Sequence, residues 1–114
     1  MTSNNSSDVL VVIITCGSTN EADMIARELV EERLAACAQQ LGTVRSTFWW
    51  NGAVQTEEEC QVTLKTTRRV LDDLVARIQE LHSYDVPEIL ALPVEEGLDD
   101  YLKWVQRETK HTDL

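Results

Sequence analysis

The sequence predicts an α+β domain with the ferredoxin-like order β-α-β-β-α-β, followed by one extra helix. Three observations carry this prediction. Two apolar stripes of helical period, at residues 22–30 and 71–78, each lie between segments typical of β-strands. An Asn-Gly pair at residues 51–52 separates two long β-prone segments, which predicts a hairpin between the two helices. Because consecutive elements tend to pack side by side, this order places both helices on one face of an antiparallel sheet.

The first two elements are a buried strand and an amphipathic helix. Residues 10–15 form a continuous run rich in β-branched side chains, as expected of a strand at the middle of a sheet. Ser18 followed three residues later by Glu21 forms a capping box, which predicts that a helix begins there. The apolar positions of this helix are Ala22, Ile25, Ala26, Leu29 and Val30, with Leu34 and Cys37 in its last turns.

The hairpin spans residues 43–66 and turns at Asn51-Gly52. Both turn residues readily take positive φ, so the pair predicts a two-residue type I′ turn with Trp49 opposite Val54. Each strand of this β-ribbon reaches about 33 Å, which is long for a domain of this size. We therefore expect part of the ribbon to overhang the domain.

Apolar side chains fall on both faces of the ribbon. In the ideal register the core face of residues 60–64 continues to Trp49, whereas Phe48 and Trp50 lie on the opposite face. Either a β-bulge shifts this alternation, or a second copy of the protein covers the second face. We expect an oligomerisation arm; a hairpin folded back on its own domain is the alternative.

The second half of the chain supplies a helix, a loop, a short strand and the extra helix. Thr66 and Thr67 precede the second helix, and Pro87 favours a loop over residues 82–88. The fourth strand is predicted at residues 89–93. The second helix has apolar positions Leu71, Leu74, Val75 and Ile78, and the last helix Leu98, Tyr101, Leu102 and Val105. The domain is predicted to span residues 9–108, with flexible tails at 1–8 and 109–114.

Composition narrows the class of protein. A chain of 114 residues, 43% hydrophobic and 26% charged, is typical of one globular domain. Its net charge of −10 argues against nucleic acid and anionic membranes as partners. Three widely spaced cysteines suit free thiols in a reducing compartment, and the apolar run at residues 9–14 is short for a signal sequence or membrane span. We expect a cytoplasmic protein.

Cys16 and the loop at residues 82–88 are the candidate metal-binding residues. Cys16 ends the first strand, while His82 and Glu88 bound the loop. A thiolate, an imidazole and a carboxylate could hold Cu(II), zinc or another divalent cation if the fold brings them together. The alternative is structural, with Cys16 as a small apolar strand residue and His82 at a helix C-terminus.

A polar cleft is the second candidate site. Glu57, Glu59 and Lys65 share the face of the ribbon that lies away from the core. Aromatic residues are expected near it: Trp50, Tyr84 and Trp104. Across a subunit boundary such a cleft could bind a small molecule, with Lys65 as the partner of an anion, or it could hold interface salt bridges around aromatic residues instead. Because the sequence carries no phosphate loop or hydrolase motif, we expect no enzymatic activity.

Five segments together resemble one known family. They are EERLAAC at residues 31–37, FWWNG at 48–52, LKTT at 64–67, LHSYDVPEI at 81–89 and YLKW at 101–104. In this order they resemble the CutA divalent-cation tolerance proteins over residues 9–108. The resemblance implies a ferredoxin-like subunit in a homotrimer, where long hairpins pair between subunits as part of a PII-like assembly.

The resemblance also implies a role in tolerance of copper and other divalent cations. Some bacterial members are described as binding copper through a first-strand cysteine and a histidine pair. Those positions correspond here to Ile14 and to Leu81 and His82, of which only His82 matches. Cys16, two residues further along the strand, could substitute for the missing cysteine, and Glu88 is a further candidate ligand. The alternative function is a PII-like sensor or adaptor that binds a small molecule in clefts between subunits.

Overall fold

The computed structural model describes residues 8–110. The predicted N-terminal tail lies outside the described residues except for Asp8, and the predicted C-terminal tail is described only at Thr109 and Lys110. The elements are β1 (Val9–Cys16), α2 (Thr19–Glu31), β2 (Cys37–Trp50), β3 (Ala53–Thr67), α3 (Arg68–Leu81), β4 (Ile89–Pro93) and α4 (Asp99–Glu108). The predicted α+β order, including the fourth strand at residues 89–93, is confirmed.

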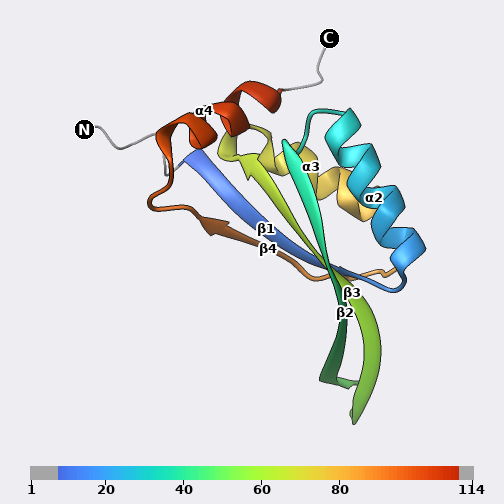
Figure 1. The fold of residues 1–114 in the computed structure, drawn as a ribbon. Coiled ribbons are helices and arrows are strands. Elements are labelled where there is room, and N and C mark those ends of the chain that lie inside the picture. Colours follow the sequence, from blue (N-terminus) through green and yellow to red (C-terminus); the bar gives the residue numbers. More distant parts are fainter. Residues whose placement is uncertain (1–7, 111–114) are drawn as a thin grey trace.

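The sheet has four antiparallel strands in the order β2-β3-β1-β4. Helices α2 and α3 lie side by side on one face of it, and α4 lies at the end of the sheet where β1 begins (Figure 1). The core between the sheet and the two helices includes Val12, Ile14, Leu64, Leu74 and Ile25, each with an exposed fraction of 0%. Its strand residues alternate along β1 and β3, as the period of two requires.

Helix α2 begins as predicted but ends earlier. The Ser18 hydroxyl accepts a hydrogen bond from the Glu21 N–H at 3.1 Å, so the predicted cap is present. The helix ends at Glu31, because Arg33 takes a left-handed conformation with φ of 66°. The Leu34 N–H then donates to the Leu29 carbonyl at 3.0 Å, which is the bond of a Schellman stop.

The prediction that Leu34 and Cys37 belong to the last turns of this helix is therefore wrong. Leu34 is buried in the connection, and Cys37 is the first residue of β2. A glycine usually marks such a left-handed stop, and here an arginine occupies the position, so the sequence carried no signal for it.

The hairpin has the predicted register. Trp49 pairs with Val54 and Trp50 with Ala53. Asn51 and Gly52 have φ values of 52° and 76°, as a type I′ turn requires. The hairpin is longer than the predicted 43–66, because β2 begins at Cys37.

A β-bulge lies at the base of the hairpin, between Gln40 and Gly42. It inserts Leu41 into β2, so the residues of β2 that share the core face change from Ala38 and Gln40 to the odd-numbered positions from Thr43 onward. Beyond the bulge the ideal register continues to the turn. Trp49 and Trp50 therefore stay on opposite faces, and the bulge does not gather the apolar side chains on one face.

We call residues 43–60 of the hairpin the arm. The arm projects beyond the sheet and helices, away from α4 (Figure 1), and it lengthens the molecule to 49 × 31 × 22 Å. Three of its apolar residues are exposed: Trp49 by 74%, Trp50 by 54% and Val54 by 57%. The overhang predicted from strand length is thus present.

Helices α3 and α4 bury slightly different residues from those predicted. In α3 the buried positions are Val70, Leu74 and Ile78, whereas Leu71 and Val75 are only half-buried at the edges of the stripe. In α4, Leu102 and Val105 are buried as predicted, against Val9 and Ala36. The prediction that Leu98 belongs to this stripe is wrong, because Leu98 precedes the helix and is 75% exposed. Tyr101 is also largely exposed, at 41%.

The open face of the sheet is the side away from α2 and α3. Val11 and Ile13 lie there, paired across the strands with Leu92 and Leu90. Leu90 and Leu92 are 54% and 49% exposed. Helix α4 covers only the end of this face near Val9, so an apolar surface is left open between α4 and the arm.

Candidate metal centre and adjoining cleft

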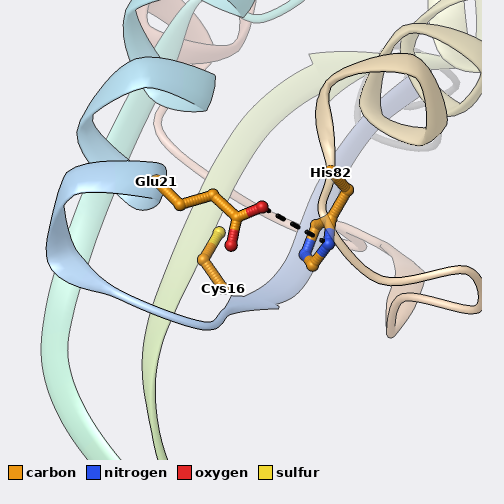
Figure 2. Close-up of side chains that lie close together, drawn as sticks. All are labelled: Cys16, Glu21 and His82. Atoms are coloured by element: carbon orange, nitrogen blue, oxygen red, sulfur yellow. Dashed lines mark ion pairs between the residues drawn. The ribbon is translucent and has the colours of Figure 1, made fainter.

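Cys16, Glu21 and His82 come together from three elements, and we call them the cluster. Cys16 ends β1, Glu21 lies in the first turn of α2, and His82 directly follows α3. Figure 2 shows the three side chains converging on one point. One potential ligand atom from each residue lies within 4.8 Å of the other two, and the Glu21 Oε2 atom is 3.7 Å from His82 Nδ1.

Both nitrogens of the His82 ring have hydrogen-bond partners. Nε2 lies 2.8 Å from the Thr15 carbonyl oxygen, and the Tyr84 N–H donates to Nδ1 at 3.1 Å. A carbonyl can only accept and an amide N–H can only donate. The geometry therefore assigns the proton to Nε2 and the lone pair to Nδ1. The side chain is fully buried.

The Glu21 carboxylate joins the start of α2 to the loop after α3. Its Oε1 atom accepts a hydrogen bond from the Gly17 N–H at 2.9 Å, and Oε2 accepts one from the Ser83 N–H at 2.6 Å. Burial raises the pKa of Glu21, but the hydrogen bonds from Gly17 and Ser83 outweigh it and lower the pKa below its ordinary value. The carboxylate is thus held in its charged form.

Cys16 is a thiol in this environment. Burial, followed by the negative charge of Glu21, raises its pKa to about 12. The set of one sulfur, one carboxylate and one imidazole fits zinc or copper by its chemistry. To bind such an ion, Cys16 must lose its proton and His82 Nδ1 must release the Tyr84 N–H.

The structure brings together two of the three residues that the sequence selected. Cys16 and His82 meet in the cluster, and Cys16 shares the helix-facing side of β1 with Ile14. Glu88 does not join them; it is exposed and lines a separate cleft. Glu21 supplies the carboxylate instead. From its sequence context Glu21 is expected only to cap a helix, although its place five residues after Cys16 at a strand-to-helix turn is a usable signal.

The cleft lies between the arm and the loop at residues 82–88. It encloses about 620 Å³. The arm contributes Phe48, Trp50, Glu57 and Glu59, and the loop contributes Tyr84 and Glu88. Trp50, Tyr84 and the two glutamates of the arm thus line a cleft within one subunit, whereas the predicted polar cleft lay across a subunit boundary and stays a prediction.

Lys65 and Trp104 do not line the cleft. The Lys65 ammonium group donates a hydrogen bond to Gln39 Oε1 at 2.6 Å, and the ring of Trp104 packs 5.6 Å from that of Tyr101. The lining residues include four carboxylates and no lysine or arginine. The cleft is therefore acidic, which does not suit the small anion for which Lys65 was considered.

One hydrogen bond ties the two walls of the cleft together. The Tyr84 hydroxyl donates to Glu59 Oε2 at 2.9 Å. Burial, followed by this bond to a charged carboxylate, raises the pKa of Tyr84 to about 12. Because His82, Ser83 and Tyr84 are each bonded to a different element, the loop wall of the cleft is fixed by the same contacts that build the cluster.

Within residues 8–110, no helix combines the length and the apolar character needed to cross a bilayer. The longest helix, α3, has 14 residues, among them three arginines, two aspartates and a glutamate, whereas a membrane span takes about 20 apolar residues.

Comparisons with known proteins place this fold and this sequence in one family. The family model of the CutA1 divalent ion tolerance protein matches residues 10–108. The divalent-cation tolerance protein CutA of Thermus thermophilus is 43% identical over 99 residues, which cover 87% of this chain and 96% of that protein. The crystal structure of CutA from Xylella fastidiosa superposes with a TM-score of 0.89 at 39% identity, covering 91% of this chain and 100% of that one.

Longer relatives exist as well. The chloroplastic protein CutA 1 of Oryza sativa subsp. japonica is 35% identical over 103 residues, covering 90% of this chain. This chain spans only 58% of that protein's length. The family model nevertheless matches nearly the whole of the described domain, and the chain belongs to the CutA1 divalent ion tolerance protein family.

Proposed function

We propose that this protein acts in divalent-cation tolerance, by binding Cu(II) or a related divalent cation rather than by catalysis. The convergence of Cys16, Glu21 and His82 within 4.8 Å is the observation that carries this proposal. The relatives' names, which state divalent-cation tolerance, support the role. The net charge of −10 adds a general attraction for cations near the surface.

In the cluster, the atoms that would bind the cation already have other bonding partners. Cys16 carries a proton. The Glu21 carboxylate accepts hydrogen bonds from the N–H groups of Gly17 and Ser83, and His82 Nδ1 accepts one from the Tyr84 N–H. A divalent ion would replace these partners, and the hydrogen bonds given up would lower its net affinity. This arrangement suits a protein that responds to excess cation more than one that keeps a resident metal.

Calorimetric titration of the reduced protein with Cu(II) and Zn(II) tests the cation proposal, with native mass spectrometry to give the stoichiometry. We expect about one ion per subunit, with binding lost in Cys16→Ser and His82→Gln. Cys37→Ser is the matched control, since Cys37 is a free cysteine outside the cluster. Binding that survives both cluster substitutions would refute the assignment.

We also propose that the protein assembles as a cytoplasmic homotrimer. The exposed apolar residues of the arm and of the open face, including Trp49, Val54, Leu90 and Leu92, support an assembly that covers them. Cys16, Cys37 and Cys60 are free thiols, as is usual in a reducing compartment.

Light scattering coupled to gel filtration tests the assembly. The parent protein should elute as a trimer, and Trp49→Ser combined with Val54→Ser should dissociate it. Val86→Ser is the control, because Val86 is 79% exposed but lies in the loop rather than on the arm. A monomeric parent protein, or a trimer unaffected by the double substitution, would contradict the proposal.

A second candidate is a PII-like sensor or adaptor that binds a small molecule in its clefts. The cleft of about 620 Å³ favours it, because cavities of roughly 300–1,000 Å³ hold small ligands in other proteins. The site's chemistry points to a cation in place of an anion.

A further inference from the structure

The cleft carries aromatic rings on both of its walls. Phe48 and Trp50 lie two residues apart on β2, so both project from the same face of the arm. Tyr84 stands on the loop wall, where its hydroxyl bond to Glu59 fixes it. Trp50 keeps 54% of its surface exposed. An accessible indole face attracts cations through the negative potential of its ring.

Most carboxylates of the cleft lack a hydrogen-bond or ion-pair partner among the described residues. Glu59 is engaged by the Tyr84 hydroxyl. Glu57, Asp85 and Glu88 make no hydrogen bond or ion pair within residues 8–110. No lysine or arginine lines the cleft to neutralise them, so a ligand that enters it meets uncompensated negative charge between aromatic surfaces.

The spacing of these carboxylates favours a large cation over a bare metal ion. Among the described residues, the cluster of Cys16, Glu21 and His82 is the one group of potential metal ligands whose donor atoms come within metal-binding range of one another. The cleft's carboxylates do not converge in that way. They surround a larger space, which suits an ion whose charge is spread over an organic group.

We propose that the cleft binds an organic ammonium ion, with the ligand's apolar part against Phe48 and Trp50 and its charge toward Glu57 and Glu88. This site is distinct from the cluster, and it takes a different class of ligand from the divalent cations of the proposed function. It also specifies which chemical class of ligand the second candidate function, a small-molecule sensor or adaptor, would bind. The two proposals can fail separately, because the cleft needs no metal and the cluster needs no aromatic residue.

Titration of the intact protein with benzylammonium, followed by calorimetry and by tryptophan fluorescence, tests the site. Benzyl alcohol and benzoate are the neutral and anionic probes of similar shape. We expect saturable binding of benzylammonium at about one per subunit, with both other probes at least roughly threefold weaker because they lack the positive charge. Equal binding of benzyl alcohol would overturn the proposal, since only an apolar surface would then be involved.

Two neighbouring tryptophans supply a matched pair of variants. Trp50→Leu keeps an apolar side chain but removes the ring from the cleft, and it should weaken benzylammonium by roughly threefold or more. Trp49→Leu alters the opposite face of the same arm and should leave the affinity unchanged. Glu57→Gln, which preserves shape, should weaken binding to a similar extent as Trp50→Leu.

Equal effects of Trp50→Leu and Trp49→Leu would overturn the site. So would the absence of binding to the parent protein, which is the result expected if a second copy of the chain fills the cleft. Loss of Cu(II) binding in Cys16→Ser with benzylammonium binding intact would confirm that the cluster and the cleft are separate sites.

Discussion

We call the described domain outside the arm the body. The same sheet runs through the body and the arm, but its side chains are buried to different extents in the two regions. In the body, β1 and β3 place Ile14 and Leu64 against α2 and α3, where both have no exposed surface. In the arm, β2 and β3 keep the same ladder, but Trp49 and Val54 face solvent together. Strand pairing therefore defines the shape of both regions, whereas apolar burial stabilises only the body.

The comparison indicates where the stability of a single subunit resides. An isolated two-stranded ribbon is marginal in water, and the arm beyond the bulge is such a ribbon. It should open locally at a lower free energy than the body unfolds. Substitutions in the two regions test this difference in stability.

The largest effect is expected in the body. Leu74 lies on α3 with no exposed surface, and Leu74→Ala should lower the free energy of unfolding by about 3–5 kcal/mol because it leaves a cavity. Urea denaturation measures this loss. Leu41→Ala at the bulge is the control, since Leu41 is 59% exposed and should change the free energy by under about 0.5 kcal/mol. Similar losses in both variants would contradict the conclusion that apolar burial in the body supplies the stability of the subunit.

The next largest effect is expected where Glu21 of α2 contacts the loop at residues 82–88, which borders the arm. Glu21→Gln replaces one of two oxygens that accept hydrogen bonds from the Gly17 and Ser83 N–H groups. One backbone N–H loses its hydrogen bond to a charged oxygen, so we expect a loss of about 1.5–3 kcal/mol. Thermal unfolding measures it. Asp23→Asn on the exposed side of the same helix is the control. An equal loss of stability in that variant would show that the hydrogen bonds of Glu21 to Gly17 and Ser83 do not account for the effect.

A smaller effect is expected in the turn of the arm. Gly52 has a φ of 76°, which strains any residue with a side chain, so Gly52→Ala should cost about 1 kcal/mol. Gly52→Asn should cost less, because asparagine tolerates this conformation. Hydrogen exchange should show faster exchange across the arm while the amides of β1 keep their protection. Uniform acceleration in both regions would mean that arm and body unfold as one unit.

The smallest effect is expected at an ion pair on the surface of the body. Arg77 binds both carboxylate oxygens of Glu32, its guanidinium Nε lying 3.0 and 3.1 Å from them. The hydrogen bond from Arg77 lowers the pKa of Glu32. A lowered carboxyl pKa stabilises the fold above the unfolded-state value, and this stabilisation is lost as the pH falls through the folded-state value.

Glu32→Gln should therefore lower the melting temperature by roughly 2 °C at pH 7. The difference from the parent protein should shrink as the pH falls through the folded-state pKa of Glu32, because the stabilisation is lost once that carboxyl is protonated in the folded protein. Melting curves across this pH range measure it. A difference that persists at the acidic end would assign the stabilisation to packing of the Glu32 side chain in place of its charge.

Local chemistry was enough to predict most of the fold. The Asn51-Gly52 turn defined the register of the hairpin, and the Ser18 cap defined the start of α2. The end of α2 was missed because Arg33 adopts a left-handed conformation that glycine usually supplies. The bulge at Leu41 was not located, since an exposed insertion leaves no trace in a short apolar pattern.

The candidate site was only half predictable. Cys16 and His82 were selected by their chemistry, and the fold brings them together. Glu88 was selected because it is near His82 in sequence, but the loop after His82 carries it to the cleft. Glu21 was missed because its approach to Ser83 depends on the packing of α2 against α3, which is a tertiary contact between residues 62 positions apart.

The bulge at Leu41 also limits how the arm can change in length over evolution. Beyond it, each position of β2 is committed to one face, with the odd-numbered residues toward the helix side. Removing or adding one residue in each strand would exchange the faces of every side chain between the change and the turn. Adding or removing two residues in each strand preserves both faces. Natural length variants of the arm should therefore differ by even numbers per strand, or carry a second bulge that restores the alternation.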